Sequence, residues 1–516
     1  MMLIWPGVRS SGRIAGLAGL ACVVAILGCA TRVDPVSRGD ENQRTEAQSG
    51  QGICAQQGWY GDGHCDRFCL APDVDCGDVS QRPAQVVAEI EAFNASLSAD
   101  ARHSKYCKMA SSPFVFYRGV NHLYWKDLAS DRRLGLFGGD RTKIWLQGDL
   151  HAYNYGSFDN DKGKVVYDLN DFDEVIIADY QMDVWRMAVS LVLIAEQNGG
   201  FPTSSLAEIL DSLSESYLDT TASYRGNDDE RDASFTAANT YGPLDNFLRD
   251  IEDSESRRDM LDKWTNAGTG GRIFDRSLAK LTAADPAVEA EIRAAMPRYQ
   301  TTVARRLQND PDYFAVKDVA RRLAAGTGSL GVPRYYVLID GQTDGQDDDR
   351  ILDVKKQGLP SAYPYLTASE HSQIDRAATD QARRTIAGYR ALASDADDHL
   401  GWMRLSDGDY SVRERSPYKE AFPTETLTSK SQFIDMAEQW GMILASAHAR
   451  SDKDHDASII DYSFDKQVDI LTDGHHGAFR ALLREVASVY AAQVNEDYRS
   501  FTAHLADSCN RAAPEK

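Results

Sequence analysis

Apolar residues recur at helical spacing in several long stretches of the chain. Across residues 204–310 they lie three or four positions apart, for example at Leu206, Ile209 and Leu213, which is the pattern of an amphipathic helix. The same kind of spacing predicts helices over residues 377–393, 433–450 and 479–506. We therefore expect a protein with a large helical part, in which residues 204–310 form a helical insertion.

Shorter runs of β-branched and aromatic residues predict strands. They cover residues 165–169, 334–339, 351–355 and 410–413. Residues 159–163, Asp-Asn-Asp-Lys-Gly, precede the first run and have the composition of a hairpin turn. Strands combined with long helices predict the α+β class.

The stretch Gly-Asp-Leu-His-Ala-Tyr-Asn places Asp149 five positions before Asn154, and Asp171 follows the next predicted strand. In kinase-like phosphotransferases an Asp at the first position orients or deprotonates the acceptor hydroxyl, while an Asn and a later Asp hold Mg²⁺. Asp149 is therefore the candidate catalytic residue. The candidate metal ligands are Asn154, Asp171 and Asp168. His151 is expected to brace the loop.

A purely structural role is the alternative for residues 148–174, because acidic turns after apolar strands are common. Asp183 opens the next predicted helix, where a carboxylate caps free backbone amides, and we expect it to be structural. Gln147 stands where His usually precedes the Gly-Asp pair of kinases.

A glycine-rich run lies far downstream of this loop. Its candidate phosphate-binding residues are Gly326, Gly328, Ser329 and Gly331. A dinucleotide-binding run of this type would open a helix, whereas here a strand follows, which favours a glycine loop inside a sheet. Lys355 in the second strand after it is placed to pair phosphate oxygens. No Glu is clearly placed to pair with this lysine, and Glu370 is a candidate only by default.

The order of these parts differs from that of ordinary kinases, in which the glycine loop comes first. Here the catalytic loop (147–174) precedes the helical region (204–310), the glycine-loop lobe (314–420) and a helical remainder (430–506). Residues 85–510 are thus expected to form a two-lobed, circularly permuted protein-kinase-like fold. Permutation is tolerated where the original termini lie close together at the surface.

The chain resembles a bacterial family called domain of unknown function 2252. The matching stretches are residues 109–119, 148–156, 168–174, 326–331, 354–355, 400–402 and 447–451. This colinear series implies membership of the family, whose name assigns no activity. Residues 171–188 also resemble aminoglycoside and choline kinases, in which an Asp placed like Asp183 opens a helix.

The N-terminus has the features of an export signal. Arg9 and Arg13 precede a short apolar run, residues 14–27, and Gly28-Cys29 then resembles a bacterial lipobox. Residues 1–28 are therefore predicted to be a lipoprotein signal peptide and Cys29 the lipidated residue. An uncleaved anchor with an incidental cysteine is the alternative. Lipidation would anchor the protein to a membrane of the bacterial cell envelope.

Residues 29–52 have the polar composition of a disordered tether. A disulfide-rich module at residues 53–77 follows, with Cys54, Cys65, Cys69 and Cys76. In an exported chain these four predict two disulfides, for which three connectivities are possible. Cys107 and Cys509, near the two ends of the main domain, are expected to pair or else to be buried free thiols.

The same module carries four acids, Asp62, Asp66, Asp73 and Asp75. Carboxylates are the ligands that Ca²⁺ prefers, and the Gly-Asp-Gly-x-Cys-Asp run resembles the calcium-binding Lin-12/Notch repeat. A Ca²⁺ site is one prediction for this set. A disulfide-stapled spacer with solvated acids is the other.

Composition agrees with a folded body, since 42% of residues are hydrophobic, and the net charge of −22 argues against nucleic-acid binding. The predicted function is a phosphotransferase that uses Mg²⁺ or Mn²⁺ with a nucleoside triphosphate on an unknown small-molecule or envelope acceptor. Two alternatives stay open: an inactive kinase-like scaffold that serves binding or assembly, and a metal-dependent phosphohydrolase.

Overall fold

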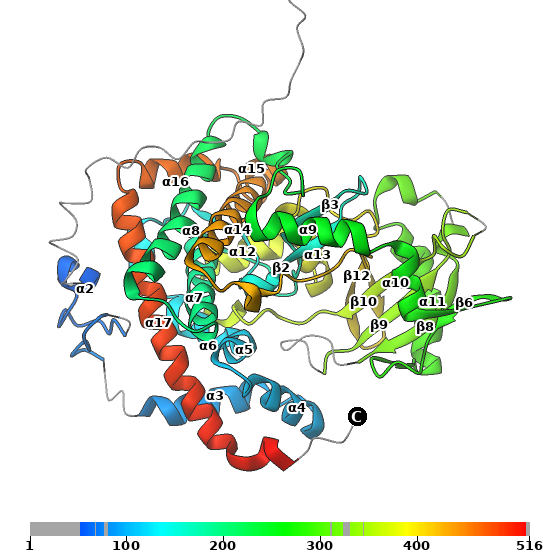
Figure 1. Cartoon of the computed structure of the whole chain (residues 1–516), viewed down its shortest axis with the longest axis horizontal. Helices are drawn as coiled ribbons and strands as arrows, with labels where there is room; N and C mark the ends of the chain where they lie inside the picture. Colours follow the sequence, from blue (N-terminus) through cyan, green and yellow to red (C-terminus); the bar gives the residue numbers. More distant parts are fainter. Residues whose placement is uncertain are drawn as a thin grey trace, which may run out of the picture. The chain divides into compact units, whose positions relative to one another are not determined.

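The computed structural model describes residues 52–67, 69–76, 81–309, 312–323, 331–343 and 345–511, which form an α+β fold (Figure 1). The predicted signal peptide, Cys29 and nearly all of the predicted tether lie outside the described residues, as do Gly326, Gly328 and Ser329. In the described part of the chain, no helix combines the length and the apolar character needed to span a membrane.

Four long helices build the larger hydrophobic core. They are α7 (Gln181–Gln197), α8 (Thr203–Ser223), α14 (Lys430–Arg450) and α17 (His476–Leu505). α14 packs on α8, and α17 packs on α7 and α8. Almost every side chain of α7 is buried, so this helix lies at the centre of the core. The shorter helices around them are α3 (Arg82–Phe93), α4 (Ala99–Met109), α5 (Pro113–Gly119), α6 (Asn121–Leu128), α9 (Gly242–Ser254), α12 (Ala368–Ala377), α13 (Gln381–Leu392), α15 (Lys453–Asp456) and α16 (Phe464–Thr472).

The start of α14 shows why a hydrophobic pattern places helix ends poorly. The helix begins at Lys430, three residues before its predicted start, because the Ser429 and Gln432 side chains form a reciprocal capping box. The first turn is polar, so apolar spacing does not reveal it.

Two small antiparallel sheets bring the candidate catalytic loop and the Asp171 turn together. β1 (Lys143–Leu146) pairs with β4 (Ile176–Asp179), and β2 (Tyr155–Asp159) pairs with β3 (Val165–Leu169). The candidate catalytic loop connects β1 to β2, and the Asp171 turn connects β3 to β4. The pairing of Leu146 with Ile176 therefore holds the two connections side by side.

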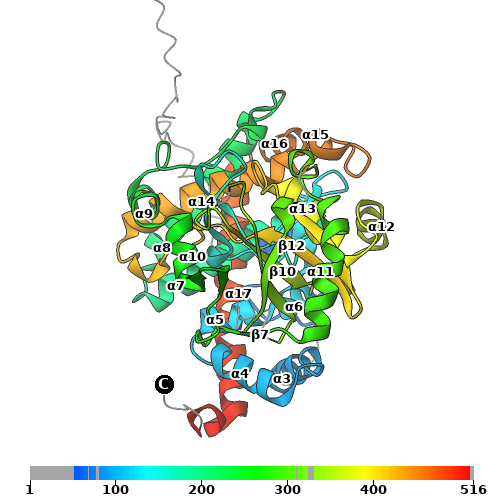
Figure 2. The same ribbon diagram turned by 90° about the vertical axis from the view of Figure 1, so that its right-hand side faces the viewer.

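A six-stranded antiparallel sheet carries Lys355. Its strands, in spatial order, are β11 (Gly401–Leu405), β12 (Gly408–Glu414), β10 (Arg350–Lys356), β9 (Arg334–Ile339), β8 (Val316–Arg322) and β7 (Leu281–Ala283). α11 (Pro286–Gln300) covers one face, which is apolar (Figure 2). α10 (Arg257–Trp264) covers part of the opposite face.

The remainder of that opposite face is polar. Asp353 and Lys355 are two positions apart along β10, so their side chains share this face. The strand register sets Arg413 beside Asp353, and it sets both Ser411 and Arg334 beside Lys355. Because this part of the sheet faces the Asp171 turn, it forms one wall of the candidate site described below.

Residues 204–310 contain helices, as predicted, together with three short strands that the prediction did not include. β5 (Thr265–Gly268) and β6 (Gly271–Phe274) form a hairpin, and β7 pairs with β8 at the edge of the large sheet. These segments are short and partly glycine-rich, and they are strands because of their partners, which a local pattern does not contain.

The N-terminal module is joined by two interleaved disulfides, Cys54–Cys69 and Cys65–Cys76. A backbone bond from Ile53 to the Glu485 carboxylate (2.9 Å) ties it to α17. The four predicted calcium ligands do not converge: among the described residues, no three of them bring ligand atoms within 4.8 Å of one another. Asp73 instead accepts backbone bonds from Gly61, Asp66 and Asp75. Asp62 and Asp66 pair with Arg132, and Asp75 accepts from Gly63.

The third disulfide joins Cys107 in α4 to Cys509 beyond α17, across 402 residues of sequence. It links the first helices of the main domain to the last, so α4 is covalently held against the C-terminal helix. Of the two alternatives for Cys107 and Cys509, pairing or free thiols, the structure has the pair.

Replacing Cys107 by Ser should lower the free energy of unfolding by about 2–4 kcal/mol, because the unfolded chain gains entropy. Denaturant unfolding without reductant measures this loss. C509S should show the same loss, and the double variant no more than either single variant, because all three remove one bond. Additive losses would contradict the pairing.

Candidate functional site

The loop between β1 and β2 is held rigidly by neighbouring side chains. The Asp183 carboxylate accepts the backbone amides of Gln147 (2.7 Å) and Gly148 (3.0 Å). Gly148 has a φ of +82°, and a Cβ there would lie 2.1 Å from the Glu174 carbonyl oxygen. Only glycine therefore permits the loop to lie against the Asp171 turn.

The role of Asp183 differs from the predicted helix cap. α7 has no side-chain cap, and the carboxylate binds the loop 35 residues upstream instead. Gln147 likewise has a clear role in place of the usual His. Its side chain accepts the Asp149 amide (2.9 Å) and donates to the Asp171 carbonyl (2.6 Å), so it bridges the loop and the turn.

Asp149 lies in a mostly buried position, with its side chain 15% exposed, and forms an ion pair with Arg186 of α7. Burial raises the pKa of Asp149 to about 7, although Arg186 lowers it, and the neighbouring acids Glu174 and Asp171 raise it further. A carboxyl group with this pKa can accept a proton near neutral pH. His151 is buried beside it, 4.0 Å from the Asp149 carboxylate, where it fills the loop interior.

Two of the three predicted metal ligands, Asn154 and Asp171, each lie near Asp149. The Asn154 amide nitrogen donates to the Asp149 carbonyl (2.9 Å), which fixes the side chain and leaves its oxygen available. The Asp171 carboxylate has no hydrogen bond or ion pair to any described residue, and it lies near Asp149 and Arg118. An amide oxygen and a free carboxylate are suitable ligands for Mg²⁺ or Mn²⁺.

Asp168 has a different role from the predicted one. Its carboxylate accepts the amides of Leu169 (2.8 Å) and Ser394 (3.4 Å) and pairs with Arg450 (3.1 Å). Both oxygens are thus bound by protein donors in a buried position. Asp168 connects β3 to the end of α14 and is not available to a metal.

Lys355 reaches the Asp171 turn across 182 residues of sequence. It forms an ion pair with Asp173, which also accepts a bond from Gln357 (2.8 Å). Burial favours the neutral acid, but Lys355 and Gln357 outweigh it and hold the pKa of Asp173 well below its usual range. Arg384 of α13 donates to the carbonyls of Asp173 and Val175, which fixes the turn.

Glu370 does not pair with Lys355, so that prediction is wrong. It caps α12 through Thr367 and pairs with Lys143 (3.2 Å). A Thr-x-x-Glu sequence at a helix start predicts this capping box. Asp173 takes the position beside the lysine.

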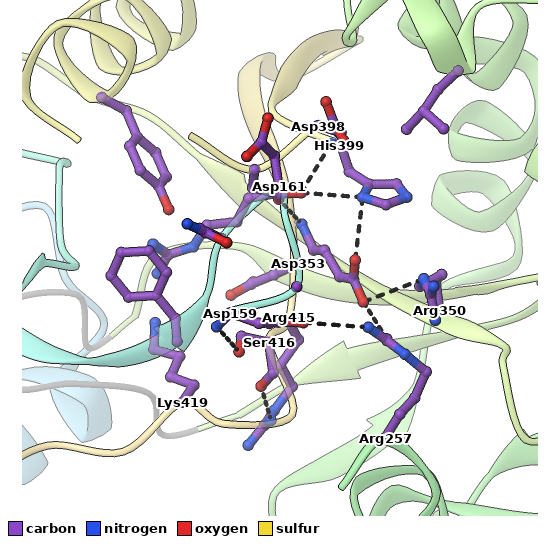
Figure 3. Close-up of a pocket in the computed structure, with 18 of the residues that line it drawn as sticks. Asp159, Asp161, Arg257, Arg350, Asp353, Asp398, His399, Arg415, Ser416 and Lys419 are labelled. Carbon is purple, nitrogen blue, oxygen red and sulfur yellow. Dashed lines mark hydrogen bonds and ion pairs between the residues drawn. The ribbon is translucent and has the colours of Figure 1, made fainter. Parts of the chain in front are cut away.

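A small cavity between α13 and the sheet is lined by Asp171, Asp173 and Lys355. It shares Asp353, Tyr389 and Arg413 with a cavity of about 230 Å³, drawn in Figure 3, which lies between the β2–β3 hairpin, the polar sheet face and residues 414–419. The shared residues make the two parts of one cleft.

The larger cavity is lined by charged groups that mostly pair with one another. Glu414 forms ion pairs with Arg257 and Arg350 (3.5 Å) and lies 3.2 Å from the His399 ring, and Arg334 pairs with Asp353 at the sheet end. Lys419, at the edge of the view in Figure 3, has no hydrogen bond or ion pair among the described residues. Burial, with Arg413 and Arg334 nearby, lowers its pKa well below the usual value.

Gly331 is the only predicted glycine-loop residue within the described part of the chain. It has a φ of +89°, and a Cβ there would lie 3.0 Å from Leu97, next to the start of α4. Gly331 thus lies between β8 and β9 in sequence and against α4, while the rest of the predicted glycine loop lies outside the described residues.

Several charged residues near the site were not predicted from the sequence. Arg186 follows Asp183 by one helical turn, so the spacing could have placed both on the face toward the loop. Lys105, Arg118 and Lys419 come from distant segments, and only tertiary packing brings the first two near Asp149 and the third to the larger cavity.

The fold and the site define an α+β protein with a cleft lined by acids and cations. The family model described as "Uncharacterized protein conserved in bacteria (DUF2252)" matches residues 98–504, and the chain belongs to this family. No curated protein and no solved structure matches the chain.

The raised pKa of Asp149 gives a pH-dependent stability. Between its ordinary pKa of 3.8 and about 7, the folded protein keeps a proton on Asp149 that the unfolded chain has released, so stability falls as pH rises through this window. Asp149→Asn removes this titration. The melting temperature of D149N minus that of wild type should increase from about pH 5 to pH 7 and then level off.

Thermal melts in a chelating buffer measure this difference, with the exposed Asp473→Asn as the matched control. A difference that is the same at every pH would show that Asp149 is not desolvated as described.

Proposed function

We propose that this protein is a kinase-like phosphotransferase that uses Mg²⁺ or Mn²⁺ and a nucleoside triphosphate. The observation that carries the proposal is the position of Lys355. It meets the turn that holds Asp171 and Asp173, beside the loop of Asp149 and Asn154, although the two segments are far apart in sequence. A lysine on a sheet facing an Asp and Asn pair is the arrangement that phosphoryl transfer requires.

The end of α14 supports a circularly permuted kinase-like fold. In ordinary kinases the corresponding helix runs directly into the catalytic loop. Here His448 lies 3.5 Å from Asp183, which holds that loop, and Arg450 binds Asp168 of the following hairpin. The last turn of α14 thus lies at the base of a loop that precedes it in sequence by about 300 residues.

In the proposed mechanism the Asp149 carboxylate accepts the proton of the acceptor hydroxyl, and Arg186 keeps this carboxylate oriented. Asn154 and Asp171 would hold the metal ion, which supplies charge neutralisation at the phosphates. Lys355 moves between Asp173 and the donor phosphate oxygens. The 230 Å³ cavity, which lies toward the Arg350 end of β10, would receive the nucleoside.

The acceptor is proposed to be a small molecule or an envelope component. The proposed location in the cell envelope, with a lipid anchor at Cys29, depends on the N-terminal sequence alone. Nothing in the cleft requires nucleic acid.

Thermal-shift measurements on the full chain test the proposal. Mg²⁺ or Mn²⁺ with a nucleoside triphosphate should stabilise the wild type by about 3 kcal/mol at a ligand concentration of a hundred times Kd. Asp171→Asn should abolish the metal-dependent part of this shift, and Lys355→Met should weaken nucleotide binding about tenfold or more.

Matched controls are Asp473→Asn and Lys466→Met, which change exposed residues of α16 and its C-terminus. Both should retain the wild-type shift. No shift with any nucleotide and metal in the wild type would reject the phosphotransferase and favour a binding scaffold.

A further inference from the structure

Lys105 is a buried lysine that the proposed mechanism does not use. It projects from α4, is 3% exposed, and makes no hydrogen bond or ion pair with any described residue. Its ammonium group lies 5.5 Å from the centre of the Phe93 ring, which stacks on His122. An unpaired buried ammonium group is costly, so its retention needs a reason.

The acids nearest to Lys105 belong to the candidate site and are bound elsewhere. Its charge interacts with Glu174 and Asp149. Glu174 accepts bonds from the Ser361 amide (2.6 Å) and from Asn121 (3.3 Å), while Asp149 pairs with Arg186. Burial lowers the pKa of Lys105 to about 8, and these acids counteract it, so the group is still mostly charged at neutral pH.

Arg118 of α5 approaches the same loop from a second helix. Its guanidinium group lies 4.8 Å from the centre of the Tyr153 ring, and its buried Nε has no hydrogen-bond partner among the described residues. The acids that interact with its charge are Asp149 and Asp171, and it forms an ion pair with neither. A guanidinium with an unused donor is suited to binding an oxyanion.

We propose that Lys105 and Arg118 bind a phosphate-type oxyanion beside Asp149. This oxyanion belongs either to an anionic acceptor or to the terminal phosphate of the donor. This inference deepens the proposed function and rests on it. The unpaired cations come from α4 and α5, and α4 lies next to Gly331, the described end of the glycine-rich run. A bound phosphate would supply the hydrogen-bond acceptors that these buried donors otherwise lack.

Calorimetric titration with inorganic phosphate, without metal or nucleotide, tests the site independently of catalysis. The full-length wild type should bind phosphate, and both Lys105→Met and Arg118→Met should weaken binding about tenfold or more. The matched controls are Lys108→Met, an exposed lysine on the same helix, and Arg499→Met, an exposed arginine on α17. Both should bind as the wild type does.

Stability separates a binding role from a structural one. Lys105→Met removes a buried unpaired charge, so this variant should melt at a higher temperature than the wild type while losing phosphate. Equal phosphate binding by the wild type and both variants, or no binding by the wild type up to about 10 mM, would overturn the inference. A less stable K105M variant that keeps phosphate binding would overturn it as well.

Two further titrations identify the source of the oxyanion. If it is the donor's terminal phosphate, the variants should bind a non-hydrolysable triphosphate analogue with Mg²⁺ more weakly than the wild type does, but should bind the diphosphate equally well. The bound analogue should also prevent binding of inorganic phosphate. If it belongs to the acceptor, phosphate binds equally to the analogue-loaded protein, and both nucleotides bind the variants normally. Phosphate binding in a protein that binds no nucleotide would reject the proposed function and leave the anion site standing.

Discussion

The contact between Lys355 and Asp173 is the interaction on which the candidate site depends. It joins the large sheet to the turn between β3 and β4, two parts of the chain with separate hydrophobic clusters. Arg413 of the same sheet face adds a second link, because it donates to the Asn170 carbonyl (2.8 Å) beside that turn. Gln357 and Arg384 bind the same turn, so the junction is a network and not a single surface pair.

Burial of charge is the second constraint on the cleft. Asp149, Asp173, Arg186 and Lys355 are withdrawn from water, and the pairing of each decides its protonation. Asp173 stays ionised because the Lys355 ammonium group and the Gln357 amide both bind its carboxylate. Asp149 pairs with one arginine and lies near two other acids, and burial raises its pKa to about 7. Two carboxyl groups in one cleft thereby acquire different capacities to take up a proton.

The sequence was sufficient where structure is determined locally. Runs of β-branched residues located β3, β9 and β10, and apolar spacing located α13, α14 and α17. The spacing of Asp149, Asn154 and Asp171 singled out three residues of which Asp149 contacts Asn154 through its backbone carbonyl and interacts with the charge of Asp171, while their roles stay a prediction. The cysteine positions indicated the two disulfides of the N-terminal module, while their connectivity required the structure.

Other features depend on contacts between distant segments. β5, β6 and β7 are strands only because of their partners, and Asp168 is taken by Arg450 of a helix far along the chain. Glu370 was a candidate partner of Lys355 only by default, because no Glu was clearly placed beside that lysine, and its own helix uses it as a cap. Lys105 and Arg118 lie in helices that precede the loop and reach it only through packing.

The most direct measurement is a crystal structure with Mn²⁺ and a non-hydrolysable nucleoside triphosphate, in which the anomalous signal locates the metal. The account predicts Mn²⁺ bound by the Asn154 amide oxygen and the Asp171 carboxylate, with Lys355 turned from Asp173 to the phosphates. A nucleotide and metal bound away from these residues, or a cleft that stays empty at saturating ligand, would contradict it.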